Sequence, residues 1–131
     1  MPRFAVLEHD SPEGLHWDLL VEWDAAARTW RLPSPPAMPD APAGSNEQTA
    51  CVALADHRLR YLDYEGPISG GRGTVRRWDA GTYRLVEDAP GRLVIDCWGQ
   101  RIEGRWILEQ VPQSPGGWRA SGWTWWTAPP V

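Results

Sequence analysis

The stretch that decides the fold covers residues 4–23 and reads FAVLEHDSPEGLHWDLLVEW. In its second half, apolar residues at every odd position from 15 to 23 alternate with His16, Asp18, Leu20 and Glu22. A period of two predicts a β-strand with one apolar face. The apolar residues 4–7 predict a preceding strand, and Ser-Pro-Glu-Gly at 11–14 has the composition of a turn. The sequence therefore predicts a β-hairpin.

His9, His16 and Asp18 on this hairpin are candidate metal ligands. His16 and Asp18 are two residues apart, so they point to the same side of the strand, about 7 Å apart along it. His9 ends the first strand, close to the start of the second. Two neutral imidazoles and a carboxylate suit Mn²⁺, Fe²⁺ or Zn²⁺ and leave positions open for water or substrate. The alternative is that both histidines are ordinary polar hairpin residues, but the carboxylate in phase with them favours a metal site.

The rest of the chain consists of short apolar or alternating runs separated by turn signals. Strands are predicted at residues 28–32, 50–55, 60–64, 73–79, 82–87, 92–98, 102–111 and 117–126. The run 50–55 is nearly all apolar, so we expect it to be buried on both faces, with His57 just past its end. A turn is predicted at 79–81. We therefore predict a mainly β fold, a small closed antiparallel β-barrel of about eight strands with little helix.

The length of 131 residues is that of one ordinary domain, so we expect residues 1–131 to form a single one. Residues 33–48 contain five prolines and predict an irregular loop within it. The tail 119–131 is either the last strand or an exposed end. Four tryptophans occur where the strand period demands core residues, and we expect them to be buried: Trp17, Trp78, Trp98 and Trp106.

All 13 basic residues are arginine. The absence of lysine from the sequence excludes a phosphate-loop lysine, a lysyl-nucleotide intermediate and a Schiff base. The net charge of −4 argues against a strong sequence-independent hold on nucleic acid. Only residues 58–84 are basic, and this cluster is either a solvated face or in part a phosphate contact. Its members are Arg58, Arg60, Arg72, Arg76, Arg77 and Arg84.

Cys51 and Cys97 each lie in an apolar run, which favours buried free thiols over a disulfide. No apolar run approaches membrane-spanning length, and the N-terminus lacks the pattern of a signal peptide. We expect a cytoplasmic protein that does not bind membranes.

Four segments resemble, in order, the 3′-phosphoesterase domain of bacterial DNA ligase D, the end-healing module of bacterial non-homologous end joining. That family opens with a Lys/Glu-His pair, a short turn and Leu-His-Tyr-Asp-Phe-Arg-Leu-Glu; here Glu8-His9 is followed by LHWDLLVE at 15–22. Its later motif Val-Glu-Asp-His-Pro-Leu-x-Tyr-x-Asp-Phe-Glu-Gly is matched by LADHRLRYLDYEG at 54–66. Residues 73–83 and 104–108 resemble two further motifs. The resemblance runs from Phe4 to about Trp118.

The resemblance implies a compact β-barrel that uses Mn²⁺, or else Zn²⁺ or another transition metal, to remove a terminal ribonucleoside and then the remaining 3′ phosphate. It makes His9, His16 and Asp18 the metal ligands, and His57 and Tyr61 contacts to the scissile phosphate. We add Arg58 and Arg76 as candidate substrate-binding residues. The expected partner is a nucleic-acid 3′ end, with repair proteins as further candidates, and the chain is expected to be a monomer.

Four positions depart from the family pattern, and each has lost a charged side chain: Leu20 replaces an arginine, Ala55 a glutamate, Thr49 a basic residue and Ser34 a lysine. Losing a charge-assisted hydrogen bond from a transition-state site typically costs roughly 10²–10³ in rate. We therefore expect weakened catalysis, and an arginine restored at Leu20 should raise the rate. Two alternatives stay open. One is a catalytically degraded metal-binding barrel that binds nucleic-acid ends, a phosphate ligand or repair proteins; the other is a metal-binding barrel with an apolar pocket for a small-molecule substrate.

Overall fold

The computed structural model describes residues 1–35 and 47–124. Strands make up most of this part of the chain, and its only helix is a single 3₁₀ turn, η1 (Leu59–Leu62). No helix among these residues is long and apolar enough to cross a membrane. The strands are β1 (Arg3–Ser11), β2 (Gly14–Trp23), β3 (Ala26–Leu32), β4 (Glu47–Arg58), β5 (Gly66–Pro67), β6 (Thr74–Ala89), β7 (Arg92–Gly99), β8 (Glu103–Gln110) and β9 (Gly117–Thr124).

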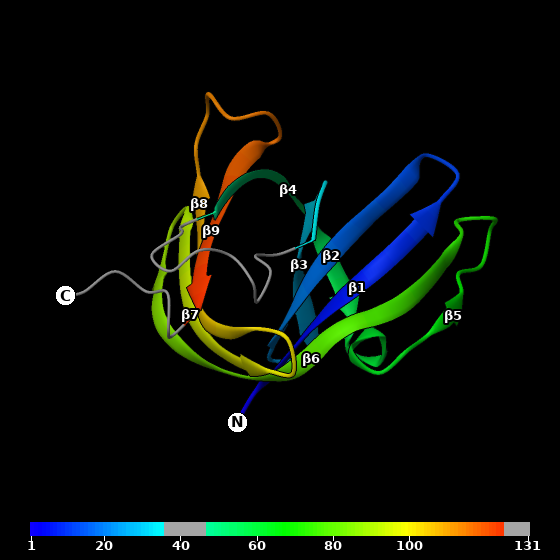
Figure 1. Cartoon of the computed structure of the whole chain (residues 1–131), viewed down its shortest axis with the longest axis horizontal. Coiled ribbons are helices and arrows are strands. Elements are labelled where there is room, and N and C mark those ends of the chain that lie inside the picture. Colours follow the sequence, from blue (N-terminus) through cyan, green and yellow to red (C-terminus); the bar gives the residue numbers. More distant parts are fainter. Residues whose placement is uncertain (36–46, 125–131) are drawn as a thin grey trace.

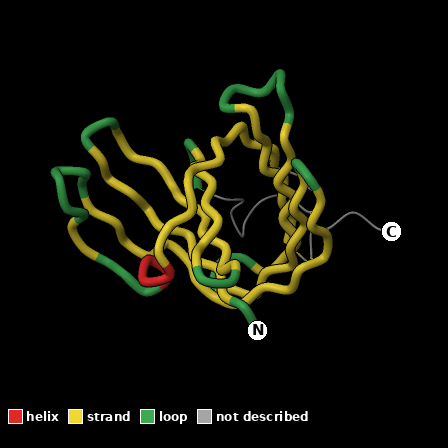
Figure 2. The backbone as a smooth tube through the Cα atoms, turned by 180° about the vertical axis from the view of Figure 1, so that it is seen from behind, coloured by secondary structure: helices red, strands yellow, loops and turns green. Residues whose placement is uncertain are grey.

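The strands form one antiparallel sheet that closes on itself (Figure 1). Neighbours follow the order β1-β2-β3-β4-β9-β8-β7-β6-β5, and β6 also pairs with β1. That pairing joins eight strands into a ring, while the short β5 lies against the start of β6. Figure 2 shows the ring and, beside it, the end of the β1/β2 hairpin and the β5 segment extending away from it. The prediction of a mainly β fold with a closed antiparallel sheet is confirmed.

Side chains on the two faces of the sheet form two separate apolar clusters. The larger cluster lies inside the ring and receives side chains from all eight of its strands, including Phe4, Trp30 and Trp106. The smaller cluster lies on the outer face of β1, β2 and β3 and includes Leu20 together with Leu62 of η1. Odd-numbered residues of β2 from 17 onward pack against the larger cluster, as the alternation predicts. The even-numbered positions of the same strand are thereby directed to the outer face.

Three of the four tryptophans expected in the core lie there. Trp106 is buried in the larger cluster, and Trp17 and Trp78 pack against it while partly exposed. The prediction for Trp98 is wrong, because 38% of it is exposed and the neighbouring Cys97 points inward. Cys97 and Cys51 are buried free thiols, as predicted.

The strand predicted at 50–55 is longer and less buried than expected. β4 continues to Arg58, so His57 lies within the strand and not past its end. Cys51 is buried, whereas 42% of Val52 is exposed. The prediction of burial on both faces is therefore wrong. The cause is the alternation of the strand, because Cys51 belongs to the larger cluster inside the ring whereas Val52, the next residue, faces outward.

A β-bulge in β4 directs His57 to the outer face. Thr29 of β3 pairs with Leu54, but Ala27 pairs with His57, so β4 contains one extra residue over this stretch. Leu54 and His57 are three residues apart and would face opposite sides of a regular strand. The extra residue shifts the alternation, and both then share the face of Thr29 and Ala27.

The strands predicted at 73–79 and 82–87 are one strand, β6, and the turn expected between them is absent. Asp79 is buried, and its carboxylate accepts the backbone N–H groups of Gln100 and Ile102, which holds the β7–β8 connection. Gly81 is required by close packing, because a Cβ there would lie 1.9 Å from the carbonyl oxygen of Trp98. Asp79 and Gly81, which suggested a turn, are instead required for contacts between β6 and the neighbouring β7–β8 region.

The strand predicted at 60–64 is also wrong, since η1 occupies most of it. Of the proline-rich segment, residues 36–46 lie outside the described part of the chain, and residues 47 and 48 already belong to β4. Of the C-terminal tail, residues up to 124 form β9, and residues 125–131 lie outside the described part.

Candidate metal centre

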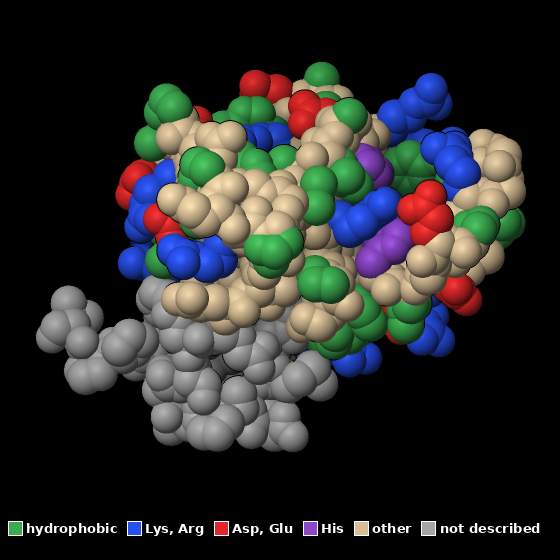
Figure 3. Space-filling view, turned by 90° about the horizontal axis from the view of Figure 1, so that it is seen from above, with side chains coloured by type: hydrophobic (Ala, Val, Ile, Leu, Met, Phe, Trp, Pro, Cys, Tyr) green, Lys and Arg blue, Asp and Glu red, His purple; other side chains and the backbone are tan. Residues whose placement is uncertain are grey.

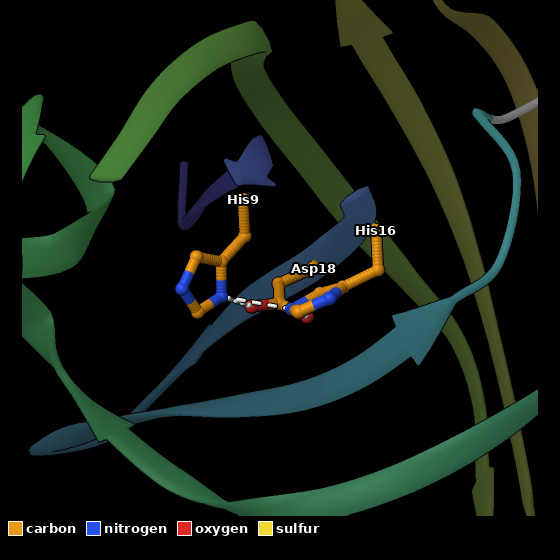
Figure 4. A group of neighbouring side chains, drawn as sticks. All are labelled: His9, His16 and Asp18. Carbon is orange, nitrogen blue, oxygen red and sulfur yellow. Dashed lines mark hydrogen bonds and ion pairs between the residues drawn. The ribbon is translucent and has the colours of Figure 1, made fainter. Parts of the chain in front are cut away.

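His9, His16 and Asp18 converge on the outer face of the β1/β2 hairpin (Figure 4). One potential ligand atom from each residue lies within 4.8 Å of the other two. His9 Nδ1 lies 2.8 Å from His16 Nε2 and 3.6 Å from a carboxylate oxygen of Asp18. All three residues are buried, with exposed fractions of 8%, 9% and 3%.

The hairpin register places these side chains together. Ser11 pairs with Gly14 across the turn, which makes His9 and His16 direct cross-strand partners. Gly14 has a φ of 123°, a conformation that L side chains rarely adopt, so glycine favours this tight connection. Asp18, two residues beyond His16, then follows on the same face.

The hydrogen bonds around His9 fit the chemistry of a metal ligand. Its Nε2 lies 2.7 Å from the backbone carbonyl oxygen of Arg72, which can only accept a hydrogen bond, so Nε2 carries the proton. In a neutral ring Nδ1 is then left with its lone pair, and Nδ1 is the nitrogen that faces His16 and Asp18. Metal-bound histidines commonly donate their second ring N–H to a carbonyl in this way. The donor set therefore fits a divalent cation.

The protonation of His16 favours the same role. Burial lowers the pKa of His16 below its ordinary 6.5, and Arg31 and His9 lower it further, against the opposing effect of Asp18. A ligand to a metal must be the neutral imidazole. His16 is therefore a neutral imidazole at neutral pH, whose Nε2–H donates to His9 Nδ1 in the absence of metal.

A cleft of about 740 Å³ opens beside the cluster, lined by Asp18 and His9 on one side and by His57, Arg58 and Tyr61 on the other. The rings of His57 and Tyr61 lie 5.9 Å apart in a T-shaped arrangement. His57 Nδ1 donates to the carbonyl oxygen of Ala55 over 3.1 Å, which leaves Nε2 as the nitrogen free to exchange a proton. Figure 3 shows histidine side chains at the surface among arginine and acidic side chains.

The structure does not bring Arg76 to this cleft. Arg76 is the cross-strand partner of Glu8, and its guanidinium lies 2.5 Å from that carboxylate. Glu8 precedes His9 on β1, so the pair lies on the opposite face of the sheet from His9. Of the two arginines proposed for substrate binding, only Arg58 lines the cleft.

Arg31 is a site residue that the sequence analysis missed. It is the register partner of Asp18 on β3, and its Nε donates to an Asp18 carboxylate oxygen over 3.2 Å. The available signal was the register of β2 with β3, which follows from the short Asp24-Ala25 connection between them.

The four positions that depart from the family pattern lie in different surroundings. Leu20 is fully buried in the smaller apolar cluster. Ala55 lines the cleft, whereas Ser34 and Thr49 are not among the residues that line it. The two apolar replacements thus lie on the strand face of the metal cluster and in the cleft beside it, respectively.

These features define a class of small β-proteins with a closed antiparallel sheet. The outer face of that sheet carries a cluster of two histidines and one carboxylate beside an arginine-lined cleft. The profile of the DNA ligase D 3′-phosphoesterase domain matches residues 7–110. The multifunctional non-homologous end joining protein LigD of Pseudomonas aeruginosa is 32% identical over 114 residues, which cover 81% of this chain and 13% of that protein. The chain therefore belongs to the 3′-phosphoesterase domain family of DNA ligase D, and it spans only a small part of the length of that relative.

Proposed function

We propose that this chain is a divalent-metal-dependent phosphoesterase that acts on the 3′ ends of nucleic acid, with Mn²⁺ as the preferred ion. The observation that carries this proposal is the convergence of His9, His16 and Asp18 beside a cleft that His9 and Asp18 line together with His57 and Tyr61. Membership of the 3′-phosphoesterase family supports the choice of reaction. The reaction is removal of a 3′ ribonucleoside or a 3′ phosphate.

His9 Nδ1, His16 Nε2 and a carboxylate oxygen of Asp18 would hold the ion. A divalent ion there would supply Lewis acidity toward a phosphoryl oxygen. The carbonyl oxygen of Arg72 keeps His9 in the correct tautomer, and burial keeps His16 neutral. On binding of an ion, the hydrogen bond between His9 Nδ1 and His16 Nε2 would be replaced, with the His16 proton moving to its own Nδ1.

His57 and Tyr61 act on the substrate from the other side of the cleft. His57 is anchored through Nδ1 to Ala55, so its Nε2 can carry the proton that the leaving oxygen needs. The hydroxyl of Tyr61 can donate a hydrogen bond to a phosphate oxygen. Both side chains come from the β4–η1 segment, so the bulge in β4 determines how they face the metal cluster.

The direct test is incubation with a primer-template carrying one 3′ ribonucleotide or a 3′ phosphate. The wild-type protein with Mn²⁺ is expected to release the terminal group. His57→Ala should lower the rate by at least about 10²-fold. Arg76→Ala, on the opposite face of the sheet, is the matched control and should retain the wild-type rate. Equal rates for wild type and His57→Ala would contradict the proposed role of His57.

A second candidate is a catalytically weakened family member that binds a nucleic-acid end without turning it over. The observation that favours it is the burial of Leu20 in an apolar cluster on the same face of the sheet as the ligands, at the position where the family pattern has an arginine. Binding of a 3′-phosphorylated end with no product after prolonged incubation with Mn²⁺ would select this second function.

A further inference from the structure

Arg31 lies between the buried carboxylate of Asp18 and the solvent. It lies on β3 directly across from Asp18, and cross-strand partners face the same side of a sheet. Its side chain is 33% exposed, whereas the Asp18 side chain is only 4% exposed. The guanidinium therefore joins a buried carboxylate to the solvent-filled space beside it.

Two cavities meet at Arg31. It lines the 740 Å³ cleft that holds His57 and Tyr61, and it also lines a neighbouring cavity of about 330 Å³ beside His16. His9 and Arg72 also line both cavities, but Arg72 directs its guanidinium to Ser69. Arg31 thus lies where a ligand in either cavity would approach the metal cluster.

Two other arginines near the centre make contacts elsewhere. Arg76 is paired with Glu8 on the opposite face, and Arg60 lies over the rings of Tyr61 and Tyr64. Within residues 1–35 and 47–124, Arg31 is the only residue whose guanidinium is hydrogen-bonded to His9, His16 or Asp18. The bond to Asp18 uses Nε–H, one of five N–H donors on the side chain.

We propose that Arg31 and the metal cluster form an oxyanion subsite, in which the Arg31 guanidinium binds a non-bridging oxygen of the substrate phosphate. This inference rests on the proposed function, because it identifies the residue that holds the phosphate at the same site. The chemical reason is that a guanidinium forms strong, charge-assisted and often paired hydrogen bonds to phosphate. The cationic side chain is Arg31 on β3, the strand next to β2. On β2 itself, the position two residues after Asp18 is Leu20, which is apolar and buried.

A purely structural role for Arg31 predicts a different pattern. If Arg31 only oriented Asp18, its loss would weaken Mn²⁺ binding, and any loss of phosphate binding would follow from the missing metal. If Arg31 binds phosphate, its loss weakens phosphate binding to protein that still holds Mn²⁺. The two affinities can be measured separately.

The experiment is calorimetric titration of the full chain, first with Mn²⁺ and then with inorganic phosphate at saturating Mn²⁺. For Arg31→Ala and Arg31→Gln we expect Mn²⁺ affinity within about 3-fold of wild type and phosphate affinity lower by about 10-fold or more. Arg31→Lys should recover part of the phosphate affinity, because it keeps the charge but not the fork geometry. Arg28→Ala is the matched control, because Arg28 lies on the same strand but packs over Trp23 and Trp30, and it should bind phosphate as wild type does.

Unchanged phosphate affinity in both Arg31 variants would overturn the inference, as would a loss that matches lost Mn²⁺ binding. Absence of phosphate binding by the metal-loaded wild type would overturn it too. Turnover of 3′ ends is assayed alongside. Phosphate binding that depends on Arg31, without any turnover, would support the subsite and contradict the proposed enzymatic function. Turnover and phosphate affinity that both survive the two Arg31 changes would contradict the subsite alone.

Discussion

At the scale of single residues, the candidate metal centre is organised by the side chains that contact Asp18. Asp18 contacts His9, His16 and Arg31, so one buried carboxylate connects the ligand pair to a cation. Two of these contacts follow from the hairpin and were predicted from the alternation of residues 15–23. The third was not, because Arg31 and Asp18 are brought together only by the β2/β3 register, which composition and period do not specify.

The burial of Leu20 changes the expected effect of placing an arginine at this position. The sequence comparison suggests that an arginine restored there should raise the rate. Leu20 is instead fully buried with Leu7, Ala27 and Leu62. An arginine at this position would place a charge among buried apolar side chains, and Asp18, two residues before it on the same face, is already hydrogen-bonded to Arg31.

We therefore expect Leu20→Arg to lower the free energy of unfolding by about 3 kcal/mol or more. Leu20→Met, which keeps volume and polarity, is the control and should cost less than about 1.5 kcal/mol. Urea denaturation followed by tryptophan fluorescence measures both. A Leu20→Arg protein as stable as wild type and faster in turnover would restore the expectation drawn from the sequence.

At the scale of elements, regular strands were predictable and their irregularities were not. The bounds of β7 and β8 lie within one residue of those predicted, and the hairpin has its predicted turn. The bulge in β4 and the two changes of register along β6 were not predicted, because an extra residue leaves the composition unchanged while it reverses which side chains face inward. The predicted strand ended at residue 55 and left His57 past its end, whereas His57 lies within β4 and lines the cleft.

The β6–β7–β8 part of the ring contains a buried ionic cluster that can be tested by pH. Asp96 is fully buried and accepts hydrogen bonds from Arg105 and Arg84 on the two neighbouring strands. Burial raises the pKa of Asp96, but the hydrogen bonds from Arg105 and Arg84 outweigh it and leave the pKa below the ordinary 3.8. The folded state thus favours the ionised carboxylate, and this stabilisation is present above pH 3.8 and lost as the pH falls through the lower pKa of the folded state.

Asp96→Asn should lower the free energy of unfolding by about 1.5–3 kcal/mol at neutral pH, because an amide presents a donor to guanidinium groups that also donate. The difference from wild type should shrink as the pH falls below 3.8, where the wild-type carboxylate becomes protonated. Denaturation at a series of pH values checks this. A difference that stays constant down to pH 2 would contradict the assigned role of the ion pairs.

At the scale of the whole molecule, the charge is distributed unevenly. The chain has a net charge of −4, but the 740 Å³ cleft is lined by four arginines and two aspartates. The arginines are Arg31, Arg58, Arg60 and Arg72. A ligand with few phosphates, such as a strand end, suits a local patch of this size better than a long duplex does.

The affinity for a 3′-phosphorylated strand should therefore depend on salt only moderately. With at most about four phosphates neutralised, the slope of log K against log salt concentration should be no steeper than about −4. Arg58→Ala with Arg60→Ala should make the slope shallower, whereas Arg84→Ala, which pairs with Asp96, should not change it. Fluorescence anisotropy at several salt concentrations gives the slopes. A steeper slope, or one insensitive to the double change, would place the nucleic acid on another surface.

The central claim is that His9, His16 and Asp18 form one divalent-metal site, and titration with Mn²⁺ followed by electron paramagnetic resonance tests it most directly. We expect one ion per wild-type chain and an affinity at least about 10-fold weaker in His9→Ala and in His16→Ala. His57→Ala, which lines the cleft without belonging to the ligand set, should bind Mn²⁺ like the wild type. A wild-type protein that binds no ion, or His9→Ala and His16→Ala proteins that bind it equally well, would contradict the account.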